Sequence, residues 1–278
     1  MSVATLPLST LRRPDLLKLS SGLWLVTMLL AQWAFFYYIV AFYGTSLATG
    51  DLEAWNRLAV FGRKPYVPGD ATGNAAFASH ALGAGIIALA GGLQLIPWIR
   101  KRFSTFHRWN GRVFLLTVLA LSVSGFYLVW VRGNSPSRLD ALITSANGLL
   151  IIGFACAAYL TAKRRDFVAH REWAMRLYLV SNGQWFLRVG IFAYFGIMKA
   201  AGQAPGFGDP FFDFWKVGCL LVPLALLQLY FMAYRSRHDG LRASVSALLA
   251  TATLAMAMGA AIFGMLCQKI ITGAPLGL

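Results

Sequence analysis

The sequence predicts an all-α protein, a polytopic membrane helix bundle with about seven transmembrane helices. Three observations lead to this prediction. Of the 278 residues, 58% are hydrophobic and only 13% are charged, whereas about a quarter of a soluble domain is charged. Apolar runs of eighteen or more residues recur along the chain, and a helix of roughly 20 residues crosses a bilayer. Tryptophans fall near the ends of several runs, as in an interfacial aromatic belt.

The first predicted span covers residues 23–43. It is followed by an outer loop, 44–76, in which residues 51–57 begin with acidic side chains and favour a short helix at the membrane surface. Six further spans are separated by short loops, so neighbouring helices should pack antiparallel. We therefore treat 1–278 as a single integral membrane domain. The six spans are 77–98, 113–131, 139–161, 173–198, 214–234 and 243–266.

The formal net charge of +15 would suggest nucleic acid as the partner of a soluble protein. Here the segments expected inside hold about twice as many Lys and Arg residues as the outer segments. The positive-inside rule then places the N-terminus in the cytoplasm and the C-terminus outside. We expect a multi-pass protein of the bacterial cytoplasmic (inner) membrane, whose basic inner face meets anionic lipid headgroups, with no nucleic-acid partner.

Two short basic stretches repeat one another, residues 106–112 and 169–176. Each places a His-Arg pair, a Trp and a second Arg next to a long apolar run. His107 and His170 are 63 positions apart, which is enough for one outward and one returning membrane helix. The repeat therefore predicts a four-helix core made of spans two to five, with both histidines at its inner end.

This inner end is the first candidate site. Two imidazoles can bind haem iron from opposite sides, so we expect His107 and His170 to be axial ligands of a haem b, or partners of a quinone. Guanidiniums pair with the propionates of haem, a role that would fall to Arg108, Arg112, Arg171 and Arg176. The alternatives are another anionic ligand and a purely structural clamp to lipid headgroups, in which Glu172 pairs with Arg176.

The second candidate site is a cavity in the outer half of the bundle around Arg188, which lies about fifteen residues into the fifth predicted span. An intramembrane arginine is functional by default, and its span contains no acidic partner. His80, Asn147 and Gln184 should reach a similar depth and complete a site for an anionic or lipidic small molecule. The alternative is an arginine held only by Asn147, Gln184 and backbone carbonyls.

These polar residues, taken as a set, resemble a bacterial family of predicted polytopic membrane proteins of unknown function. The similarity covers about residues 74–195. The resemblance implies no activity, but it does imply which positions form the signature of the family. They are Ser79-His80, Gln94-Leu95, His107-Arg108 with Gly111-Arg112, His170-Arg171 with Met175-Arg176, and Arg188.

Three functions remain open at this stage. The first is a redox-type membrane protein that binds haem b or a quinone. The second is a transporter or an enzyme that handles an anionic or lipidic small molecule, although no nucleophile or phosphate-binding motif is present. The third is a structural or assembly subunit of a membrane complex. Cys219 and Cys267 both fall near the outer face, where a disulfide or two free packing cysteines are the alternatives.

Overall fold

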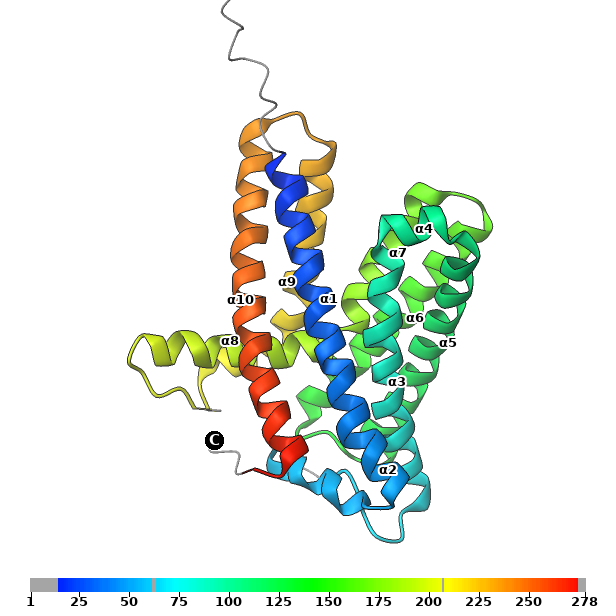
Figure 1. Ribbon diagram of the computed structural model, residues 1–278, viewed down its shortest axis with the longest axis vertical. Helices are drawn as coiled ribbons and strands as arrows, with labels where there is room; N and C mark the ends of the chain where they lie inside the picture. Colours follow the sequence, from blue (N-terminus) through cyan, green and yellow to red (C-terminus); the bar gives the residue numbers. More distant parts are fainter. Residues whose placement is uncertain (1–14, 62–63, 207, 275–278) are drawn as a thin grey trace, which may run out of the picture.

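The computed structural model describes residues 15–61, 64–206 and 208–274, and every regular element in these ranges is a helix (Figure 1). Residues 1–14 and 275–278 of the predicted domain lie outside the described residues. In chain order the elements are α1 (Leu16–Ile39), the π-helical turn η2 (Val40–Gly44), α2 (Thr45–Thr49), the 3-10 helix η3 (Leu52–Phe61), α3 (Ala71–Leu95), α4 (Pro97–Arg102), α5 (Ser104–Phe126), the π-helical turn η4 (Tyr127–Val131), α6 (Arg138–Lys163), α7 (Phe167–Ser181), α8 (Gly183–Ala200), α9 (Pro210–Arg235) and α10 (Asp239–Thr272).

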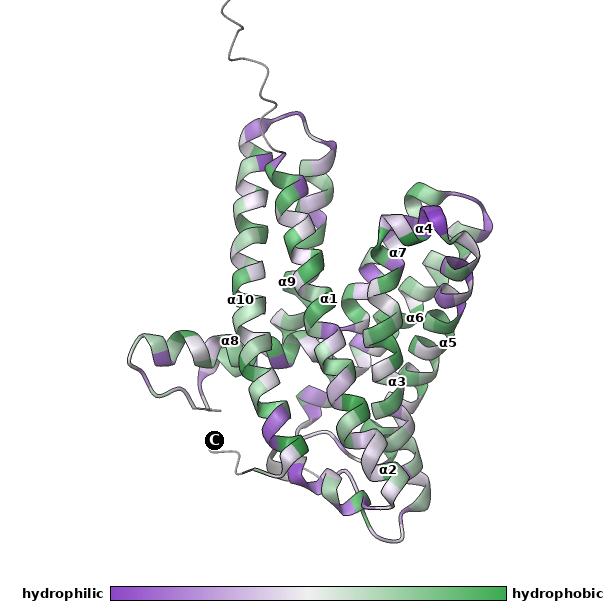
Figure 2. Cartoon of the chain, in the orientation of Figure 1, coloured by the Kyte–Doolittle hydropathy of each residue, from purple (hydrophilic) through white to green (hydrophobic). Residues whose placement is uncertain are grey.

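Within the described ranges, six helices are long and apolar enough to cross a membrane. Five helices correspond to predicted spans one, two, four, six and seven, and the sixth, α5 with η4, to span three. Figure 2 shows hydrophobic residues along the length of these helices and hydrophilic residues gathered mainly at their ends. The fold is therefore a helical membrane bundle, as predicted, and its orientation in the membrane stays a prediction.

Local sequence signals fix where the helices begin. A side-chain oxygen caps the first main-chain N–H groups of four helices, and a proline occupies the first turn of α4 and α9, where its missing N–H is not needed. The N–H of Lys18, and then the Arg242 guanidinium, lower the pKa of the Asp15 carboxyl. The four capping residues are Asp15, Asp70, Ser137 and Asp166.

The predicted fifth span, 173–198, is wrong as a single helix. The chain forms α7 and α8 instead, and Figure 1 shows α8 running crosswise to α1 and α10. The break falls at Asn182, whose buried side chain donates to the carbonyl of Tyr178 at 2.8 Å. Asn competes in this way with the main-chain bonds of a helix, and the following Gly183 is a poor helix former.

Helices α3, α5, α6 and α7 pack as the predicted four-helix unit, and α1, α9 and α10 pack beside it. Small residues of α3 allow close contact, since a Cβ on Gly91 would lie 2.8 Å from the Phe114 ring of α5 and 3.1 Å from Tyr178 of α7. Close approach through small residues is a main source of helix association in lipid. Helix α8 meets α10 even more closely, because a Cβ on Gly259 would collide with the carbonyl oxygen of Val189.

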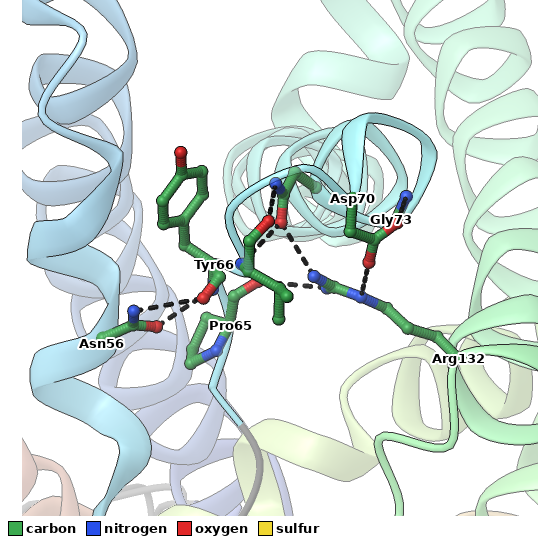
Figure 3. Close-up of polar contacts among 8 residues, drawn as sticks. Asn56, Pro65, Tyr66, Asp70, Gly73 and Arg132 are labelled. Carbon is green, nitrogen blue, oxygen red and sulfur yellow. Dashed lines mark hydrogen bonds and ion pairs between the residues drawn. The ribbon is translucent and has the colours of Figure 1, made fainter.

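The start of α3 and the end of η4 are joined by an ion pair whose arginine is buried (Figure 3). Arg132, which directly follows η4, donates to Asp70 at 2.9 Å, to the Pro65 carbonyl at 3.0 Å and to Asn74 at 2.8 Å. Asn74 also bonds both main-chain groups of Val67. The Arg132 side chain is only 7% exposed. This network holds the second half of the outer loop against α3.

We expect Arg132→Gln to lower the thermal unfolding midpoint of the protein in detergent and to speed proteolysis within residues 44–76. Removing one partner of a fully buried ion pair costs about 3–5 kcal/mol, and the partial exposure of Asp70 puts the expected loss below that range. Arg138→Gln is the control, because it removes the same charge from an exposed position at the start of α6. Equal midpoints for the two variants would contradict this role.

A second pair of variants tests the crossing of α8 and α10. Gly259→Ala should destabilise the protein by about 1–3 kcal/mol, the usual range for overpacking, because its Cβ meets the backbone of α8. Gly264→Ala, one turn later on α10, meets nothing within 4 Å and should leave the unfolding midpoint unchanged. The comparison fails if both alanines are tolerated equally.

Candidate functional site

The two histidines of the repeated motif lie in the first turns of α5 and α7. Helix α5 packs against α3 and α6, and α7 packs against the same two helices, so α5 and α7 occupy opposite corners of the four-helix unit. His107 and His170 are both half-buried, and each is the fourth residue of its helix. The structure therefore places the two imidazoles at the same end of the unit, on facing helices.

His170 is held in one defined tautomer. Its Nδ1 lies 2.9 Å from the main-chain carbonyl oxygen of Ala158, near the end of α6. A carbonyl only accepts hydrogen bonds, so Nδ1 carries the proton and donates. The lone pair of Nε2 is then free, which is the arrangement that metal-binding histidines commonly have.

His107 is tied to α3 through its main chain. Its carbonyl accepts from the Gln94 side chain at 3.2 Å, and Asn110, one turn later, donates to the Ala90 carbonyl at 2.9 Å. Its Nδ1 is buried and has no hydrogen-bond partner among the described residues. A buried polar atom without a partner is costly, so this nitrogen is where a ligand of the site would be held.

The four predicted arginines do not form one group around the imidazoles. Arg171 stacks on Tyr234 of α9. Arg176 lies over Trp173 and over Phe231 of α9, and forms an ion pair with Glu172 at 3.7 Å. Glu172 also pairs with Arg235 at the end of α9.

The arginines of α5 are instead engaged within their own helix. The Arg112 guanidinium lies 4.6 Å from the Trp109 ring centroid, and Arg108 donates to Thr105 at 3.3 Å. The arginines of α7 thus join α7 to α9, whereas the contacts found for those of α5 stay within α5. Their pairing with haem propionates stays a prediction. No cluster of three or more His, Cys, Asp or Glu side chains suited to a metal ion occurs among the described residues.

The second site centres on Arg188 in α8. Its Nη1 donates to the carbonyl of Gln184 at 2.7 Å, and the side chain is exposed. Its positive charge acts on His80 of α3, on Tyr38 and Tyr43, and on Cys267 of α10. These four residues come from three regions far apart in the sequence, 38–43, 80 and 267, that lie near this guanidinium.

His80 is tied to α5 by its side chain. Its Nδ1 lies 2.9 Å from the Ser124 hydroxyl oxygen, which is also 3.2 Å from the Leu121 carbonyl oxygen. When the hydroxyl donates to this carbonyl, Ser124 accepts from His80 and the Nε2 of His80 keeps a free lone pair. The site thus contains a permanent cation and, in this arrangement, a hydrogen-bond acceptor.

Asn147 and Gln184 line a different cavity of about 30 Å³, together with Asp140 and Lys216, which form an ion pair at 3.7 Å. The Asn147 side-chain oxygen is buried without a partner among the described residues. A cavity of this size holds about one water molecule. Of the four residues predicted for the outer site, Gln184 holds Arg188 through its main-chain carbonyl and also lines this small polar cavity with Asn147, whereas His80 is hydrogen-bonded to Ser124 of α5.

Sequence reasoning missed Tyr38 and Tyr43. An aromatic run near the end of α1 and η2 was visible, but aromatic residues in a membrane span usually serve packing.

Cys219 and Cys267 are both buried and free. Of the two alternatives for this pair, the structure therefore has free packing cysteines and no disulfide between them.

This architecture defines a multi-pass helical membrane protein. Residues 77–205 match the model of a family described as Predicted membrane protein (DUF2306), a family of unknown function. The match confirms the family resemblance predicted from the polar motifs, and it contains His80, His107, His170 and Arg188. No curated protein and no solved structure gives a significant match.

Proposed function

We propose that the protein is a membrane redox protein that binds one haem b at the inner end of its four-helix unit, between His107 and His170. The observation that carries this proposal is the equivalent position of the two imidazoles, each in the first turn of its helix, on α5 and α7. Cofactor sites in helical bundles are built from side chains on facing helices. Haem iron would here gain two neutral nitrogen ligands, and it carries one electron at a time between its ferric and ferrous states.

The hydrogen bonds of the two histidines support the proposal. The Ala158 carbonyl holds the proton of His170 on Nδ1, which orients the ring and makes Nε2 a better ligand. The Nδ1 of His107 has no hydrogen-bond partner in the described part of the chain, so no side-chain hydrogen bond there prevents this ring from binding iron. A quinol is the second ligand with fitting chemistry, because its hydroxyl would donate to the free Nε2 of His170.

The test is the absorption spectrum of the protein expressed with haem supplied and purified in a neutral detergent. We expect a Soret band, and α and β bands on reduction that indicate low-spin bis-histidine haem. His107→Ala and His170→Ala should each lower bound haem by more than the about 10–100-fold that outer-shell changes cost. His238→Ala is the control, because His238 is exposed in the loop between α9 and α10.

A colourless, correctly folded wild-type protein would overturn the haem proposal. Loss of haem in the His238→Ala variant as well would show that binding is nonspecific. A colourless protein that retains an extractable quinone, which His170→Ala then loses, would replace haem by the quinone at the same site.

A further inference from the structure

A second cavity, of about 210 Å³, lies between α1, α8 and α10. Its walls are mainly apolar and include Phe35 of α1, Trp185 of α8 and Phe263 of α10. An apolar cavity of about 150 Å³ is large enough for benzene, so this one accepts a larger apolar group. Gly264 and Gln268 of α10 also line it and are exposed, so the cavity opens to the surface of the bundle.

Arg188 lies next to this cavity. Trp185 and Arg188 are three positions apart in α8, and residues with this spacing share a helix face. Arg188 itself is not among the residues that line the cavity. Its helix nevertheless brings it within one turn of the cavity wall, and Val189, the next residue, packs against α10, the helix that contributes Phe263 and Gly264 to the same wall.

The charge of Arg188 is uncompensated. An arginine side chain stays protonated in proteins and has five N–H donors, and the one hydrogen bond found goes to the Gln184 carbonyl. No carboxylate lies within ion-pair distance of it among residues 15–61, 64–206 and 208–274. Its neighbour Val189 lies against Gly259, 20 residues into the apolar helix α10, where an unpaired charge is costly.

We propose that this region binds an amphiphilic monoanion. The acidic oxygens pair with Arg188, and the apolar part fills the cavity between α1, α8 and α10. Arg188 carries one positive charge, which a ligand with one negative charge would neutralise. The planar guanidinium also matches the paired oxygens of a carboxylate or a phosphodiester. The free Nε2 of His80 suits a ligand that also carries a hydroxyl.

Both chemistries have a source in the membrane. A carboxylate would be the head of a free fatty acid, and a phosphodiester would be the headgroup of a phospholipid. The site is independent of the haem proposal, since none of its residues belongs to the inner histidine pair. Its test uses the full-length protein and needs no haem.

The experiment measures binding of decanoate to the protein in a neutral maltoside detergent, by the rise in the thermal unfolding midpoint. Decanol, with the same chain and no charge, is the matched ligand. We expect decanoate to stabilise the wild type and decanol to have little effect. Arg188→Gln should weaken decanoate binding at least about tenfold, as expected for the loss of a charge-assisted hydrogen bond.

Two further variants distinguish the contribution of the Arg188 charge from that of the apolar cavity. Lys199→Gln removes one charge from an exposed position on the same helix and should bind decanoate like the wild type. Gly264→Leu keeps Arg188 but fills the cavity at a point where a side chain meets nothing within 4 Å, and it should lose binding while remaining folded. Partitioning of decanoate into micelles is common to all variants, so it cancels in the comparison.

Native mass spectrometry distinguishes the two sources. A phosphatidylglycerol that the wild type retains, that Arg188→Gln loses and that blocks decanoate identifies a lipid headgroup. Decanoate binding without a retained lipid identifies a free acid. The proposal is overturned if the wild type neither retains a lipid nor binds decanoate, if decanol stabilises it as much as decanoate, or if Arg188→Gln binds as tightly as Lys199→Gln.

Discussion

The turn at Asn182 is the constraint on which both halves of the molecule depend. A straight helix from Phe167 to Ala200 would have carried Arg188 along the four-helix unit. Because the Asn182 amide bonds the Tyr178 carbonyl, the chain leaves the helix axis and α8 crosses the bundle to reach α10. Gly259 then allows the two backbones to touch. The polar neighbourhood of Arg188 exists only because of this crossing.

Buried polar groups divide the interior into distinct regions. Most buried polar groups of the described residues form a hydrogen bond with a main-chain or side-chain partner, because lipid offers no water to bind them. Among the described residues, the exceptions include His107 and Asn147, which belong to the inner pair and to the small polar cavity. Gln32 and Tyr178 are also buried with an unpartnered polar atom. Interior sites of this kind are where ligands or water contribute most.

The repeated motif in α7, residues 169–176, can serve both a structural role and a ligand-binding role. Both arginines of α7 stack on aromatic residues of α9, and Arg176 shares Glu172 with Arg235, which fastens the four-helix unit to α9. His170, in the same motif, points its Nδ1 at α6 instead. Structural and ligand-binding roles can therefore coexist within seven residues, since successive positions of a helix face different neighbours.

Hydropathy alone determined the class of the protein, because runs of about 20 apolar residues are long enough to cross a bilayer as helices, which satisfy their own backbone polar groups. The six long helices and the four-helix unit follow from runs that were visible in the sequence, and so does the placement of His107 and His170 at equivalent helix starts. The polar motifs were also sufficient to predict the family resemblance that residues 77–205 confirm.

Only the tertiary structure decided what those residues meet. Hydropathy does not distinguish a residue that breaks a helix, as Asn182 does, from an ordinary polar residue within a helix. The direction of α8 was therefore not predictable. Tyr38 and Cys267 come from two distant segments, and no spacing in the chain links them to Arg188. Asn147 was assigned to the site of Arg188 by depth, but side-chain direction around the helix axis, which depth does not specify, placed it in another cavity, and Gln184 contacts Arg188 only through its main-chain carbonyl.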